Sequence, residues 1–210
     1  MIPSEAFEPI IDELKRRPLE YNAYRDKAGK GLSQAFGLVN RRCLPPDYSR
    51  QNWKRAYLYH LLLDFAEKYV DISFNAITLN QNYRANKHYD KGNLGESYLV
   101  AFGSYTGGDL LIHEGDLSGN HDIYCKPIKT DFSKILHSVD FFTGERYSVV
   151  YYWLDVGTLT FPPPSVKQED GKWYFYRGDE KITNGLPHPL RGRKREEILA
   201  TALKKKQEKV

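Results

Sequence analysis

Hydrophobic and polar residues alternate in the middle of the chain in a pattern typical of β-strands. The segments 77–84, 96–104, 109–113 and 146–154 are rich in β-branched and aromatic residues, and Gly, Asn and Asp turns separate them. Short strands of this kind predict an all-β barrel or sandwich. We therefore expect a β core in this part of the chain.

Helical patterns lie mainly before this core. Residues 4–17 predict an amphipathic helix with Ser4 as N-cap, Pro9 in its first part and Pro18 at its end. Residues 50–69 form the strongest helical pattern, apolar on one broad face. Residues 19–49 carry Gly, Asn and a Pro-Pro-Asp turn signal at 45–47. We expect that stretch to be irregular, as a lid or as a segment facing the substrate.

Two weaker patterns follow the core. Residues 156–176 contain three prolines, a charged loop and an aromatic strand, which predict a hairpin covering the barrel. Core packing is favoured over base stacking for Trp173, Tyr174 and Tyr176. Basic residues gather at 41–55 and 191–209, and the second segment has helical propensity. Two interpretations of 191–209 stay open: a solvated terminal helix, or a segment that contacts phosphates.

Composition restricts the class of protein. A chain of 210 residues with 40% hydrophobic residues can form one domain with a sizeable core. It has no apolar run of membrane-spanning length, and acidic residues stand where a signal peptide would be apolar. Cys43 and Cys125 are too few for a disulfide framework, so we expect an intracellular protein, cytoplasmic or nuclear. The net charge of +4 permits nucleic-acid binding without requiring it.

The pair His88 and Asp90 carries the strongest chemical signal. Among six histidines only His88 has an acid two positions on, and of the later ones only His137 has an arginine, Arg146, nine positions on. Residues two apart on a strand point the same way, so His88 and Asp90 can face one metal ion. Two imidazoles and one carboxylate form the facial triad that holds non-haem Fe(II) and leaves positions open.

Arg146 and Ser148 are also two residues apart on a predicted strand, so their side chains should point to the same face. Both would face into the barrel beside the metal, with Tyr147 turned out. A planar guanidinium can bind a carboxylate through two parallel hydrogen bonds, and the far carboxylate of 2-oxoglutarate is such a group. The combined pattern predicts an oxygenase that uses Fe(II), 2-oxoglutarate and O2. The other histidines are expected in structural or surface roles: His60, His113, His121 and His188.

The stretch 77–152 resembles the double-stranded β-helix of the 2-oxoglutarate oxygenase superfamily. Within that superfamily, 77–84, 88–93 and 103–108 resemble the TET and J-binding-protein group of DNA-base oxygenases. The resemblance implies an α+β chain with a jelly-roll or cupin-like core, flanking N-terminal helices and a C-terminal helix. It implies a single domain over 1–210, with helices and a loop in 1–70, the core in 71–178 and a basic tail in 179–210.

The resemblance also implies roles for particular residues. Fe(II) would bind His88, Asp90 and His137, and 2-oxoglutarate would bind Arg146 with Ser148 assisting. One or more residues of the preceding strand would contact co-substrate or substrate: Asn80, Asn82 and Arg84. Residues 129–136 depart from the glycine-containing turn that often precedes the distal histidine of this superfamily.

The implied reaction is hydroxylation of a C–H bond. The leading hypothesis is the methyl group of thymine or 5-methylcytosine in DNA, with the base flipped out of any duplex. DNA would meet the basic residues at 41–55 and 191–209. The alternatives are the same chemistry on a protein side chain or a small molecule, and a non-catalytic binding module. Residues 19–49 and 82–97 are the candidate segments for reading the substrate.

Overall fold

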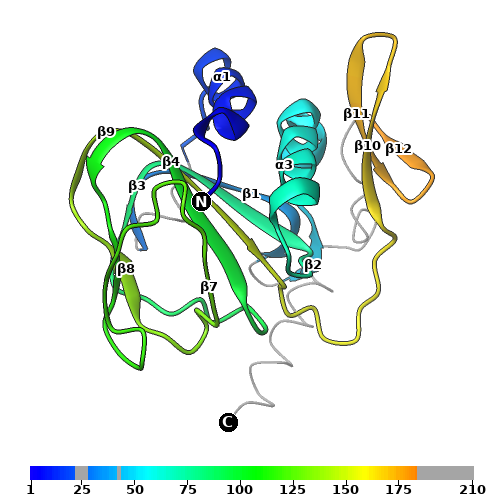
Figure 1. The fold of residues 1–210 in the computed structure, drawn as a ribbon. Helices are drawn as coiled ribbons and strands as arrows, with labels where there is room; N and C mark the ends of the chain where they lie inside the picture. Colours follow the sequence, from blue (N-terminus) through cyan, green and yellow to red (C-terminus); the bar gives the residue numbers. More distant parts are fainter. Residues whose placement is uncertain (22–27, 42–43, 184–210) are drawn as a thin grey trace.

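The computed structural model describes residues 1–21, 28–41 and 44–183 (Figure 1). The predicted basic helix at 191–209 lies outside these ranges. The helical elements are η1 (Ser4–Phe7), α1 (Glu8–Arg16), α2 (Gln51–Lys54) and α3 (Ala56–Tyr69). The strands are β1 (Gly29–Arg41), β2 (Leu44–Tyr48), β3 (Ala76–Ala85), β4 (Ser97–Gly107), β5 (Leu110–Ile112), β6 (Gly119–His121), β7 (Ile128–Thr130), β8 (His137–Val139), β9 (Phe142–Tyr152), β10 (Pro164–Glu169), β11 (Lys172–Arg177) and β12 (Glu180–Ile182).

The chain from β3 to β9 alternates between two antiparallel sheets. The large sheet has the order β2-β1-β3-β9-β4-β7 and the small sheet the order β6-β5-β8. The segment at His88 joins the small sheet through an antiparallel bridge to His137. In chain order, β3, β4, β7 and β9 therefore belong to the large sheet, while the His88 segment, β5, β6 and β8 belong to the small one. This connectivity is that of a double-stranded β-helix, so the predicted jelly-roll core is confirmed.

Helices cover the outer face of the large sheet (Figure 1). The Phe7 ring, just before α1, stacks on Phe102 of β4 with ring centroids 4.4 Å apart. In β9, Tyr147 and Tyr151 point into this layer and are buried. The prediction that Tyr147 faces out is therefore half right: it points away from the barrel interior, but onto the helical layer rather than into solvent. The alternate residues of β9 face the interior.

The region predicted to be irregular, 19–49, instead supplies two strands. β1 pairs with β3 and β2 pairs with β1, which extends the large sheet beyond the β-helix. β2 contains Pro45 and Pro46, but it lies at the edge of the sheet, where the missing N–H groups cost no ladder bonds. The predicted helix at 50–69 is divided at Arg55, whose backbone leaves the helical region.

The hairpin predicted at 156–176 is present as β10 and β11, but it does not lie in the β-helix. With β12 it forms a separate three-stranded sheet. This sheet packs on α3, where Trp173 stacks on His60 with ring centroids 4.1 Å apart and Phe175 is buried. The last strand of the large sheet in chain order, β9, ends at Tyr152. Within the described ranges, no helix is long and apolar enough to cross a membrane.

Candidate metal centre and cavity

The three predicted metal ligands lie together at the small sheet: His137 is in β8, His88 is bridged to it, and Asp90 is in the loop that follows His88. His88 and His137 are paired across the bridge: each backbone N–H donates to the other residue's carbonyl, at N···O distances of 2.9 and 3.1 Å. The Asp90 N–H donates to the Phe132 carbonyl at 3.0 Å. One ligand atom from each of His88, Asp90 and His137 lies within 4.8 Å of the other two. The structure thus brings together the set that the sequence predicts.

Hydrogen bonds fix which nitrogen of each imidazole can bind a metal. Nδ1 of His88 lies 2.7 Å from the Asn86 carbonyl oxygen, and Nδ1 of His137 lies 2.9 Å from that of Ile135. A carbonyl oxygen only accepts, so each Nδ1 carries a hydrogen and each Nε2 presents its lone pair. Such backbone contacts orient histidine ligands in metal sites.

The electrostatic environment also suits a cation. The His88 Nε2 atom lies 3.4 Å from the Asp90 carboxylate, and the two imidazole centroids are 4.3 Å apart. Burial lowers the pKa of His137, against the opposing effects of the Ile135 carbonyl and Asp90, so its ring is neutral at pH 7. Two imidazoles and one carboxylate fit a divalent cation of intermediate softness such as Fe(II).

Arg146 is buried in the same cavity with part of its guanidinium unpaired. Only 1% of its surface is exposed. The Tyr105 hydroxyl hydrogen-bonds to it, and the rings of Tyr105 and Phe142 lie 5.4 and 5.5 Å from its Cζ atom. Its Nε and Nη2 atoms are buried and have no hydrogen-bond partner within the described ranges. These two N–H groups form one edge of the guanidinium, the edge that can grip a carboxylate through two bonds.

Gly108 makes room for this side chain. A Cβ atom at Gly108 would lie 2.8 Å from the Arg146 Nε atom and 2.9 Å from its Cδ atom. The φ angle of Gly108 is +77°, which also favours glycine. The Gly107-Gly108 pair, interpreted from sequence as a turn, therefore leaves space for the guanidinium as well.

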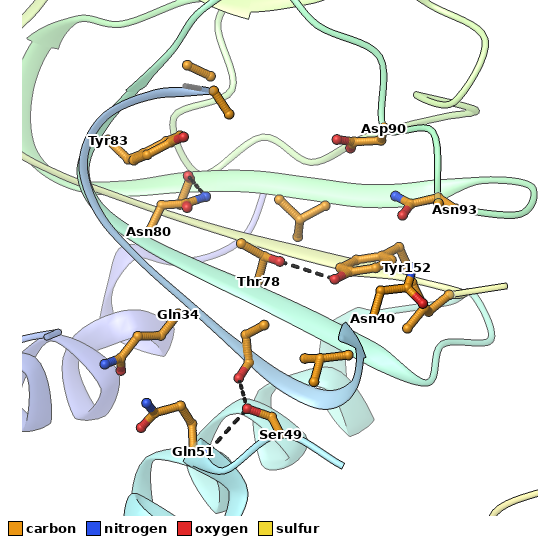
Figure 2. A pocket seen from close by; sticks show the side chains of 18 of the residues that line it. Gln34, Asn40, Ser49, Gln51, Thr78, Asn80, Tyr83, Asp90, Asn93 and Tyr152 are labelled. Atoms are coloured by element: carbon orange, nitrogen blue, oxygen red, sulfur yellow. Dashed lines mark hydrogen bonds between the residues drawn. The ribbon is translucent and has the colours of Figure 1, made fainter. Parts of the chain in front are cut away.

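The other predicted binding residues fall into two groups. Asn80 lines the cavity and donates to the Ser148 hydroxyl at 3.2 Å (Figure 2). Asn82 instead accepts the Arg146 backbone N–H at 2.8 Å, and the Arg84 guanidinium lies 5.8 Å from the centroid of the Phe141 ring. Both side chains are on exposed positions of β3. Contact of Asn80 or Ser148 with a ligand stays a prediction, and Asn82 supports the strand that carries Arg146.

A cavity of about 1440 Å³ joins these groups. The inward residues of β9, Arg146 to Tyr152, form one wall, and the metal ligands form another. Strands β1 and β2 extend the cavity, with Asn40 and Ser49 among the polar residues there (Figure 2). Ligand pockets for small molecules are typically about 300–1,000 Å³, so there is room for more than a small dicarboxylate.

The basic segment at 41–55 has a mixed environment. Arg50, Lys54 and Lys91 line the cavity and are exposed, and Lys91 lies in the loop after Asp90. Arg41 also lines it but pairs with Asp47 at 2.6 Å. Arg55 is buried, and its guanidinium donates to the carbonyls of Arg17 and Pro18. The prediction that this whole segment meets a polyanion is therefore wrong for Arg55, which has a structural role.

Sequence and structure comparisons add little beyond the fold. No protein-family model and no curated protein sequence matches the chain. Similar solved structures include NgTET1 in complex with 5mC DNA (14% identity, 74% of this chain and 70% of that chain, TM-score 0.49). A second is a Pseudomonas putida prolyl-4-hydroxylase (14% identity, 73% of this chain and 89% of that chain, TM-score 0.47). A third is a 2OG-Fe(II) oxygenase family oxidoreductase from Burkholderia pseudomallei (16% identity, 68% of this chain and 74% of that chain, TM-score 0.43). At such identities, function has to be argued from the site itself.

Proposed function

We propose that this protein is an Fe(II)- and 2-oxoglutarate-dependent dioxygenase that hydroxylates a C–H bond. One observation carries the proposal: the buried Arg146 has an unpaired N–H edge in the same cavity as the His88, Asp90 and His137 set. Leaving a buried guanidinium edge unpaired costs free energy, because those N–H groups have lost their water. A carboxylate ligand would remove that cost.

Each group has a definite task in this reaction. His88, Asp90 and His137 would hold the metal, and Arg146 would bind the far carboxylate of 2-oxoglutarate. Bound Fe(II) supplies the redox chemistry, in which 2-oxoglutarate and O2 yield succinate and carbon dioxide while the substrate is hydroxylated. Asn80 and Ser148, joined by their hydrogen bond, offer polar contacts on the large sheet beside Arg146. Val150, further along the inward side of β9, helps to exclude water.

The proposed substrate is a pyrimidine methyl group in DNA. The support is the sequence resemblance to DNA-base oxygenases, a cavity volume of about 1440 Å³, and the cationic side chains Arg50, Lys54 and Lys91 along the cavity. Backbone phosphates would meet these cations, and the methyl group would approach the metal. Hydroxylation of a protein side chain or a small molecule is the competing outcome of the experiment below.

The decisive experiment is a reaction with anaerobically iron-loaded protein, opened to air with 2-oxoglutarate and methylated DNA. Mass spectrometry would read both succinate and digested nucleosides. Hydroxymethyl nucleosides together with succinate would support enzyme class and substrate together. Succinate without modified nucleosides would retain the oxygenase and reject this DNA substrate. His137→Ala should abolish turnover, while His121→Ala, a histidine outside the ligand set, should not.

Binding to DNA can be tested separately from turnover. The affinity should fall steeply with salt, because each neutralised phosphate contributes roughly −0.9 to the slope of log K against log salt. Lys54→Gln should reduce that slope by about one and weaken binding to all sequences alike. Arg16→Gln, on the exposed face of α1, is the matched control. An affinity that does not respond to salt would favour a protein or small-molecule substrate.

A further inference from the structure

A carboxylate outside the cavity links the two segments that carry the metal ligands. Glu114 follows β5 and is half-buried. Its Oε1 atom accepts the Leu136 backbone N–H at 2.8 Å, and Leu136 immediately precedes His137. The Tyr89 hydroxyl donates to the same carboxylate. Tyr89 lies between His88 and Asp90, so Glu114 contacts both ligand-bearing segments through their neighbours.

A second set of hydrogen bonds, made by His113, also holds the start of β8. His113, next to Glu114, donates its backbone N–H to the Leu136 carbonyl at 2.9 Å. Its Nε2 atom lies 2.8 Å from the Ser138 hydroxyl, and Ser138 immediately follows His137. The pair His113 and Glu114 thus binds the residues on both sides of His137. The β5–β8 register, with Ile112 opposite His137, sets this alignment.

The geometry points to Glu114 as a positioning residue for the metal centre: it holds the His88–Asp90 segment and His137 at their mutual distance. This inference rests on the metal assignment in the proposed function. Glu114 does not touch the metal site itself. A carboxylate accepts stronger hydrogen bonds than a neutral group does, and here one carboxylate serves the two segments that the His88–His137 bridge pair joins. Loss of such an outer contact typically weakens metal binding about 10–100-fold.

Cobalt(II) titration, followed by its visible absorbance, tests the inference without turnover. Wild type should bind Co(II), and His137→Ala should not. Glu114→Ala should bind about 10–100-fold more weakly. Glu114→Gln should recover much of the affinity, because its amide oxygen can still accept the Leu136 N–H. Asp116→Ala removes an exposed carboxylate from the same loop and should bind as wild type does.

Hydrogen exchange of the metal-free protein gives an independent readout. Glu114→Ala should speed exchange at residues 86–91 and 134–139 and leave β10–β12 unchanged. Tyr89→Phe should speed exchange mainly at 86–91, and its effect should be non-additive with Glu114→Ala, as expected for partners in one contact. If Glu114→Ala unfolds, Glu114→Gln and Tyr89→Phe still decide the matter.

The outcomes separate the two claims. Unchanged Co(II) affinity and unchanged local exchange in the Glu114 variants would overturn the positioning role. Lower overall stability with normal Co(II) affinity would also overturn it, since that is the behaviour of a purely structural residue. If wild type fails to bind Co(II) while Glu114→Ala speeds local exchange, the metal assignment fails and the link between the two segments stands.

Discussion

At the scale of single residues, Gly108 gives the sharpest test of the co-substrate site. An alanine Cβ there would meet the Arg146 Nε and Cδ atoms at 2.8 and 2.9 Å, so the guanidinium has to move. We expect Gly108→Ala to raise the KM for 2-oxoglutarate by about tenfold, or about 1.4 kcal/mol of binding free energy. Steady-state kinetics with varied 2-oxoglutarate measures this change, with succinate as the product read.

Gly171→Ala is the matched control for Gly108→Ala. Its φ angle is +74°, close to that of Gly108, but a Cβ atom there meets nothing within 4 Å. Both variants carry the backbone strain of a left-handed residue, roughly 1–2 kcal/mol. Only Gly108→Ala should change the KM. Equal KM values in the two variants would show that the guanidinium does not bind the co-substrate.

The clustering of His88, Asp90 and His137 could be predicted because strand periodicity and order in the chain indicate it. A spacing of two residues puts His88 and Asp90 on the same side of a strand. His137 then only has to come from a neighbouring strand. Glu114 and Tyr105 could not be found in this way. Their roles depend on which loop lies beside which strand, and their own sequence neighbourhoods carry no spacing signal. Asn82 was placed on the right strand, but its side chain supports the backbone of Arg146.

At the scale of elements, the long strand β1 was the main error. Gly31 and Gly37 have φ angles of +126° and +73°, and they interrupt the alternation that identifies a strand. Local sequence therefore indicated a loop, while pairing with β3 overrode it. The break at Arg55 has a similar cause. Its side chain is held by the carbonyls of Arg17 and Pro18, contacts that a helical pattern does not reveal.

Phe175 of β11 is the most deeply buried side chain of the sheet β10–β12. Phe175 is fully buried, with the rings of Tyr48 and Tyr59 at 5.4 and 6.0 Å. Phe175→Ala should lower the free energy of unfolding by about 3–5 kcal/mol, measured by urea denaturation. Tyr174→Ala, on the other face of the same strand, should cost much less, since its ring mainly contacts the Lys181 ammonium. Similar losses for both variants would contradict an anchor at Phe175.

At the scale of the whole molecule, the candidate site spans two sheets. The two histidine ligands belong to the small sheet, Asp90 lies in the adjoining loop, and Arg146 belongs to the large sheet. The β-helix brings these parts together from residues far apart in the chain. Fold class was predictable because the strands of this region are rich in β-branched and aromatic residues and are separated by turn residues. The extra sheet at the C-terminal side was not, because no periodicity tells which element a hairpin packs on.

This division between sheets predicts coupled stabilisation by metal and co-substrate. A dicarboxylate that contacts both Arg146 and the metal side would join the two sheets, so each ligand should strengthen binding of the other. With anaerobic Mn(II) and 2-oxoglutarate each at a free concentration about 100 times its Kd, each binding step adds about 2.7 kcal/mol of stability.

Thermal unfolding with each ligand alone and with both measures the coupling. At subsaturating concentrations the combined shift in Tm should exceed the sum of the separate shifts. Arg146→Ala should keep the shift due to Mn(II) and lose the excess, because the large-sheet contact is gone. His137→Ala should lose both, because the small-sheet contact is the one that holds the metal. Additive shifts in wild type would mean that the two ligands bind apart, and the cavity would then not be a single oxygenase site.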